Sequence, residues 1–158
     1  INALTGRNMA LWHGACHVHE QFSLGKILAL KETHPSAEVI CHPECRKQIV
    51  EVSDYVGSTA GLLKHAKLSD NKIFIVATES GVLHEMRKSC PDKLFIPAPP
   101  EDDSCMCNEC NFMRMNTMEK LYQALLTEQP EIVVDEDIRE RAIRPIRRML
   151  DISARLGL

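Results

Sequence analysis

The chain has 158 residues, of which 44% are hydrophobic and 26% charged, and its formal net charge is −3. This length accommodates one domain with its own core, and the near balance of charge argues against attachment to nucleic acid or to a membrane surface through net charge. No apolar segment approaches the ~20 residues of a membrane span or has the form of a secretory signal, so we expect neither a nucleic-acid nor a membrane partner.

The cysteine content bears on the compartment. Seven cysteines are an odd number, which favours a reducing cytoplasm over a disulfide framework. We therefore predict a cytoplasmic location. The chain begins at Ile1 rather than at a methionine, and we expect it to be part of a longer polypeptide.

Strands and helices alternate along residues 9–96. In chain order, short apolar segments and apolar residues at helical spacing predict a strand at 9–12, a helix at 21–32, a strand at 37–41, helices at 46–52 and 60–67, a strand at 72–77, a helix at 79–89 and a strand at 94–96. The continuous apolar run at 72–77 is typical of a strand that is covered on both faces. The pattern predicts an α/β fold in which helices cover both faces of a parallel sheet, with right-handed crossovers, as a three-layer αβα domain.

A different pattern follows residue 110. Apolar residues at helical spacing predict a helix over 116–128, and a short strand is expected at 132–134. A long helix is predicted over 135–156, because acidic residues fill its first turn, where they complement the helix dipole. Pro145 is expected to kink this helix or to split it. The α/β domain is therefore followed by a helical C-terminal tail.

Polar residues follow the predicted strands at their carboxyl ends, which is where parallel sheets bind ligands. Residues 13–19, the turn His42-Pro-Glu-Cys45 and the pair Thr78-Glu79 all have this position. His42 and Glu44 are candidates for the site, although turn formation and capping of the next helix would also explain them. Ser58 or Thr59 is expected to cap the helix that follows and to leave backbone N–H groups free for an anion.

Three cysteines, Cys105, Cys107 and Cys110, occur within six residues in a polar segment. Free cysteines commonly pack as small hydrophobic residues, but this segment offers no apolar face to bury them. We therefore predict a metal or cluster site here, of a type that the spacing does not identify, with further ligands elsewhere in this chain or outside it.

The remaining cysteines and histidines have simpler interpretations. Cys16 fits either a site or a buried thiol, Cys41 belongs to the core and Cys90 is structural. His65 and His84 are predicted to be surface groups.

Several of these segments together resemble quinolinate synthase. They are Trp12-His-Gly-Ala-Cys16-His-Val-His-Glu20, His42-Pro-Glu-Cys45, Val56-Gly-Ser-Thr59, Ala77-Thr-Glu79, Pro91-Asp-Lys93 and Cys107-Asn-Glu-Cys-Asn-Phe-Met-Arg-Met-Asn116. The resemblance covers essentially the whole chain, in order and with consistent gaps. It implies an enzyme of three similar α/β domains around one 4Fe–4S cluster, which has three cysteine ligands, one from each domain, and one open iron. Such enzymes condense iminoaspartate with dihydroxyacetone phosphate to quinolinate, the precursor of NAD.

The resemblance also implies residue roles. Cys16 and Cys110 match cluster ligands, His42 and Glu44 match catalytic groups that face the substrate and the open iron, and Cys45 matches no ligand. Ser58 and Thr59 match an element that binds a substrate phosphate or carboxylate. Relatives often space the three cysteines of the loop as C-x2-C-x2-C, and the shorter first gap here leaves the roles of Cys105 and Cys107 open.

The same resemblance implies a division of the chain. Residues 1–16 match the end of a second domain, residues 17–110 the third domain, and residues 111–158 a C-terminal helical tail. The third cluster cysteine and the N-terminal domains, which would be partners of this chain, lie outside it. The competing hypothesis is a non-catalytic module in which Cys105, Cys107, Cys110 and a His or Cys from the first half hold structural zinc or iron.

Overall fold

The computed structural model describes residues 2–12, 14–102 and 108–157, so His13, Cys105 and Cys107 lie outside the described residues. The chain forms two compact units, residues 1–115 and 116–158, and each is considered by itself. Because Cys105 and Cys107 are not among the described residues, the metal site predicted to use them stays a prediction.

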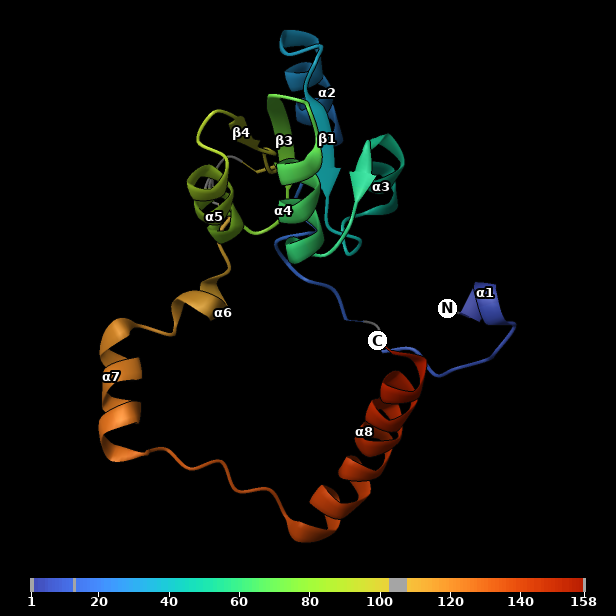
Figure 1. Cartoon of the computed structure of the whole chain (residues 1–158), viewed down its shortest axis with the longest axis vertical. Helices are drawn as coiled ribbons and strands as arrows, with labels where there is room; N and C mark the ends of the chain where they lie inside the picture. The colour runs from blue at the N-terminus through green and yellow to red at the C-terminus, as the bar shows by residue number, and fades with distance from the viewer. Residues whose placement is uncertain (1, 13, 103–107, 158) are drawn as a thin grey trace. The chain divides into compact units, whose positions relative to one another are not determined.

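The first unit is built on a four-stranded parallel sheet in the order β2-β1-β3-β4 (Figure 1). Its strands are β1 (Glu38–Cys41), β2 (Tyr55–Val56), β3 (Ile73–Ala77) and β4 (Leu94–Pro97). The central pair β1 and β3 runs in register from Glu38 opposite Phe74 to Cys41 opposite Ala77. After their first residues both strands are buried throughout, as expected for a parallel sheet that is covered on both faces.

Helices cover the two faces. Alternate strand residues point to opposite sides, so β1 contributes Val39 and Cys41 to one core and Ile40 to the other. The first core is completed by Ile27 of α2 (Leu24–Thr33) and Ile49 of α3 (Lys47–Val52). The second is completed by residues of α4 (Thr59–Leu68) and α5 (Gly81–Ser89), among them Leu62 and Met86. This arrangement confirms the predicted α/β fold.

The strand predicted at residues 9–12 is wrong. These residues have no regular structure, and the Trp12 side chain is 94% exposed. An apolar segment becomes a strand only where a neighbouring strand pairs with it, and no strand among the described residues does so here. Two one-turn helices were not predicted, α1 (Asn2–Thr5) and α6 (Asn111–Arg114).

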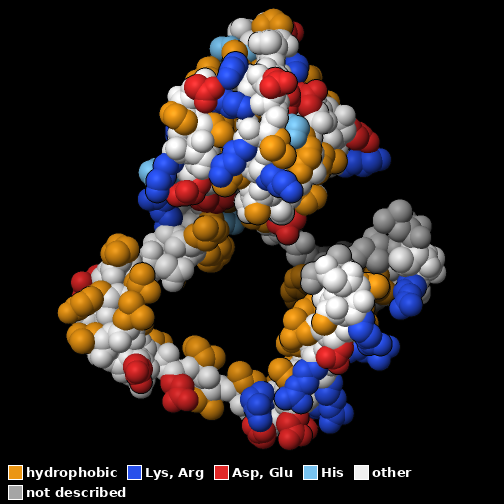
Figure 2. Space-filling view, in the orientation of Figure 1, with side chains coloured by type: hydrophobic (Ala, Val, Ile, Leu, Met, Phe, Trp, Pro, Cys, Tyr) orange, Lys and Arg blue, Asp and Glu red, His pale blue; other side chains and the backbone are white. Residues whose placement is uncertain are grey.

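The second unit holds α7 (Met118–Thr127) and α8 (Glu136–Leu156). The strand predicted at 132–134 is wrong, because this segment pairs with no described strand and stays irregular. The helix α8 continues through Pro145, so the expected split does not occur. No residue of either helix is buried, and hydrophobic side chains lie exposed along α7 (Figure 2). None of the described helices has both the length and the apolar character that crossing a membrane requires.

The side chain of Glu38, at the start of β1, is held by three hydrogen bonds. Its carboxylate accepts hydrogen bonds from His65 Nε2 at 2.6 Å, Ser69 Oγ at 2.9 Å and Asn71 Nδ2 at 3.2 Å, and the His65 ring stacks on Tyr55. The prediction that His65 is a surface group is therefore wrong, whereas His84 is exposed as expected. Burial raises the pKa of Glu38, but the three hydrogen bonds outweigh it and bring the pKa below its usual value.

This network predicts a pH-dependent stability. Because the pKa of Glu38 is lower in the folded than in the unfolded chain, its contribution is present above the unfolded pKa and is lost as pH falls through the folded pKa. We expect Glu38→Gln to lower the free energy of unfolding at pH 7 by about 1–2 kcal/mol and to differ less from the unchanged chain as pH falls below 4. Urea unfolding across this pH range measures the effect, with the exposed Glu85→Gln as the matched control. A constant difference at every pH would contradict the prediction.

Candidate functional site

The carboxyl ends of β1 and β3 bring together the polar residues that follow them. The backbone N–H of His42 donates to the Ala77 carbonyl at 3.1 Å, which extends the pairing of the two strands by one residue. His42 and Thr78 therefore leave the sheet side by side, and Thr78 is only 1% exposed. The predicted convergence at this end of the sheet is confirmed for His42, Glu44 and Thr78.

His19 lies at the centre of this group. Its Nδ1 lies 3.2 Å from Glu44 Oε2, and its Nε2 lies 3.1 Å from Thr78 Oγ1. The ring stacks on His42, with centroids 4.4 Å apart and planes within 6°. The sequence predicts residues 13–19 at this end of the sheet, which is confirmed for His19, but it does not single out His19. The sequence signal that could have identified His19 is its position three residues after Cys16, in a segment that resembles the family. No strand precedes His19 among the described residues, so the position of a strand end could not have identified it.

These hydrogen bonds specify a protonation state. A carboxylate can only accept, so the pair with Glu44 places the proton of neutral His19 on Nδ1 and leaves Nε2 to accept from the Thr78 hydroxyl. Burial first, and then the neighbouring His42, lower the pKa of His19 and outweigh the opposing effect of Glu44. We therefore assign His19 as the neutral ring at neutral pH, fully hydrogen-bonded in that form.

His42 takes the other tautomer. The backbone N–H of Glu44 donates to His42 Nδ1 at 3.3 Å, which leaves Nε2 as the nitrogen that carries the proton of the neutral ring. The alternative explanation of this turn as a helix cap finds no support, because Arg46 is the N-cap of α3 and no side chain caps it. With its side chain 60% exposed, Glu44 is open to a ligand, whereas His42 is mostly covered.

Cys16, His19 and Glu44 could hold a metal ion, with the metal taking the place of one of the two hydrogen bonds of the His19 ring. Each offers one ligand atom, and these atoms lie within 4.8 Å of one another. A sulfur, an imidazole nitrogen and a carboxylate oxygen form a donor set that suits zinc or iron. A cavity of about 480 Å³ opens beside them. It is lined by Trp12, Gly14, Ala15, Cys16, Glu20 and Glu44.

Cys110 packs against the same core as Cys16. Both are partly buried against the cluster that contains Cys41 and Cys45. The Cys45 thiol donates to the Ala77 carbonyl at 3.4 Å, and its interaction with Cys41 and its burial raise its pKa. Cys45 therefore stays a buried thiol. Cys41 and Cys90 are also buried, as their assignment to the core and to a structural position requires.

Ser58 and Thr59 follow β2 at the same end of the sheet. Gly57 N donates to the Cys41 carbonyl at 3.1 Å, and Ser58 caps α4 through its Oγ, which accepts from Gly61 N at 3.2 Å. The predicted cap is therefore confirmed. Both side chains are exposed at the start of a ten-residue helix, where free N–H groups favour an anion.

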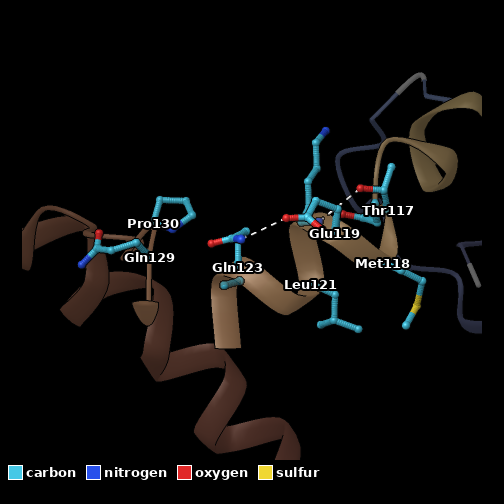
Figure 3. A pocket seen from close by; sticks show the side chains of 10 residues that line it. Thr117, Met118, Glu119, Leu121, Gln123, Gln129 and Pro130 are labelled. Atoms are coloured by element: carbon cyan, nitrogen blue, oxygen red, sulfur yellow. Dashed lines mark hydrogen bonds between the residues drawn. The ribbon is translucent and has the colours of Figure 1, made fainter. Parts of the chain in front are cut away.

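A larger cavity, of about 690 Å³, belongs to the second unit (Figure 3). It is lined by residues of α7 and of the segments before and after α7, and the hydrogen bonds among them join residues close in sequence. Gln123 donates to Glu119 at 2.9 Å, and Thr117 caps the helix. It contains no histidine or cysteine, so its size reflects an uncovered helix face rather than a site for chemistry. The candidate site therefore lies in the first unit.

Comparison with known proteins identifies the family of the chain. The sequence model of the quinolinate synthetase A protein family matches residues 1–151. Proteins named quinolinate synthase are similar to the chain in Microcystis aeruginosa (51% identical over 97% of this chain and 48% of that protein), Nostoc punctiforme (55% over 94% and 46%) and Chloroherpeton thalassium (51% over 94% and 46%). The chain thus spans about half the length of these relatives. With nearly all of its residues matched, the chain belongs to the quinolinate synthetase A family.

Proposed function

We propose that this chain supplies part of the active site of a quinolinate synthase, which condenses iminoaspartate with dihydroxyacetone phosphate to quinolinate. The observation that carries the proposal is the convergence of Cys16, His19 and Glu44 beside His42 at one end of the sheet. Family membership supports the same reaction. We further propose that a 4Fe–4S cluster is held by Cys16, Cys110 and a third cysteine outside this chain.

The donor residues fit such a group. Cys16 and Cys110 are partly buried against one core, and thiolates are the usual ligands of iron–sulfur clusters. When bound, the cluster would supply an open iron that acts as a Lewis acid toward a hydroxyl or carboxylate oxygen. Only two of the described cysteines have this position, since Cys41, Cys45 and Cys90 are buried.

The other roles fall to residues around this group. The exposed Glu44 carboxylate can accept a proton, and His42 can donate one from Nε2. His19 holds Glu44 in position from the buried side. Ser58, Thr59 and the free N–H groups of α4 are proposed to bind a phosphate or carboxylate of the substrate.

The chain is proposed to act with the N-terminal domains of the same protein, in the cytoplasm. We assign residues 1–16 to the end of a second domain, residues 17–110 to a third domain and residues 111–158 to a helical tail. The chain matches about half the length of its relatives, which leaves room for further domains in such a protein.

The competing proposal is a structural zinc module, which the Cys16, His19 and Glu44 donor set also suits. Anaerobic purification of a hybrid protein, in which this chain is joined to the unmatched part of the Microcystis aeruginosa relative, separates the two. A brown protein that contains iron and sulfide supports the enzyme. A colourless protein with stoichiometric zinc supports the module.

Cluster assembly in the hybrid is expected to depend on Cys16 and Cys110. Cys16→Ser or Cys110→Ser should abolish the cluster absorbance and the iron content, because serine is a poor ligand for cluster iron. Cys90→Ser is the matched control, since this buried thiol lies in the other core, and it should leave both unchanged. A full iron complement in Cys110→Ser would move the ligand to Cys105 or Cys107.

Turnover is expected to depend on His42 and Glu44 without loss of the cluster. His42→Ala or Glu44→Gln in the hybrid should lower quinolinate formation by ~10² or more, the usual scale for loss of an acid–base group. Iron and sulfide analysis of the same samples checks that the cluster is intact. Near-normal turnover with a normal cluster would leave these residues only a local structural role.

The 158-residue chain alone is expected to form no quinolinate. It offers only two of the proposed cluster ligands, and its second unit has no buried core. After anaerobic reconstitution it should bind iron weakly and tend to associate. Chromatographic detection of quinolinate, with the hybrid as positive control, makes the measurement. Product from the isolated chain would mean that the site is complete within it.

A further inference from the structure

We propose that Asn108 is a positioning residue that orients the Cys110 sulfur before any metal binds. This inference rests on the proposed function of Cys110 as a cluster ligand. Asn108 is buried, being only 6% exposed, and its φ of 46° is one of two positive φ values outside glycine among the described residues. Its side chain is thus a buried polar group within two residues of the thiol.

The contacts of Asn108 join two strand ends. Its Nδ2 donates to the Ala98 carbonyl at 2.6 Å, one residue beyond β4. Its own carbonyl accepts from Ser80 N at 3.1 Å, just before α5. The backbone at residue 108 is therefore tied to the chain that leaves β3 and to the chain that leaves β4, which are neighbours in the sheet.

Glu79 continues the attachment to Cys110. Glu79 Oε1 accepts from Cys110 N at 3.4 Å, while Oε2 accepts from Gly81 N at 2.7 Å. The start of α5 and residues 108–110 therefore share one carboxylate. The single-turn helix α6 begins directly after Cys110, so the backbone on both sides sets the direction of the Cys110 Cα–Cβ bond, which carries the sulfur.

The physical reason for an asparagine follows from these contacts. Left-handed backbone is costly for most residues with a Cβ, and asparagine tolerates it better than most. Buried hydrogen bonds hold such a conformation in place. Metal binding must order its ligands, and this ordering costs entropy. When the direction of a thiol is already fixed, that cost is smaller and the metal is bound more tightly.

The first test uses the metal-free, reduced 158-residue chain and the alkylation rates of individual cysteines, resolved by peptide mass spectrometry. Asn108→Ala removes both the amide and the tolerance of positive φ, whereas Asn108→Asp keeps that tolerance but places a carboxylate oxygen opposite the Ala98 carbonyl in place of the donor. Both should raise the alkylation rate of Cys110 about tenfold, the effect expected from loss of a buried hydrogen bond. The rate at Cys90 should stay within about twofold, because its core is separate.

Glu128→Ala is the matched control. Among the described residues, Glu128 is the other one outside glycine with a positive φ, 53°, and it is exposed in the second unit. It should leave the Cys110 rate unchanged. Equal acceleration at Cys90 and Cys110 in the Asn108 variants would indicate general loosening and overturn the proposal, as would an unchanged Cys110 rate.

The second test uses the hybrid protein after cluster reconstitution. Asn108→Ala should lose iron to a chelator about tenfold faster, and its electron paramagnetic resonance signal should fall in parallel, whereas Glu128→Ala should match the unchanged hybrid. Iron loss at the unchanged rate overturns the role of Asn108. A hybrid that assembles no cluster even with Asn108 intact contradicts the proposed function instead, and the alkylation rates still decide whether Asn108 orients Cys110.

Discussion

The pairing of β1 with β3 is the constraint on which the rest of the first unit depends. Both strands are buried on two faces, so their register is fixed by packing on each side. The backbone bond from His42 to Ala77 carries that register one residue past the sheet. His42 and Thr78 are therefore placed by the core itself, and a shift of one residue would turn both toward the wrong face.

His19 joins Glu44, Thr78 and His42 into one rigid group. One imidazole contacts Glu44, Thr78 and His42, which belong to two different strand ends. Because its neutral form satisfies both ring nitrogens, the group needs no buried charge of its own. The charge that remains is on Glu44, whose side chain is 60% exposed and can reach a ligand.

Sequence reasoning predicted the sheet and its helices because their signals are local. Continuous apolar runs such as Ile73–Ala77 mark buried strands, and Ser58 marks the start of a helix. It failed where pairing decides the outcome, as at residues 9–12 and 132–134, which are apolar but have no partner strand among the described residues. It missed His19 and Asn108 for a related reason. Their importance comes from contacts with Thr78 and Ala98, which a linear pattern does not display.

The two units meet different physical requirements. The first has two buried cores and can stabilise its sheet with its own residues. In the second, α7 carries Met118, Leu121 and Leu125 exposed on one side, and α8 has no buried residue. A helix of ten residues without a core is marginal in water, and both helices leave apolar side chains that are stabilised when they are covered. The chain matches about half the length of its relatives, and in the proposed enzyme the remaining part would cover this surface and supply the third thiolate.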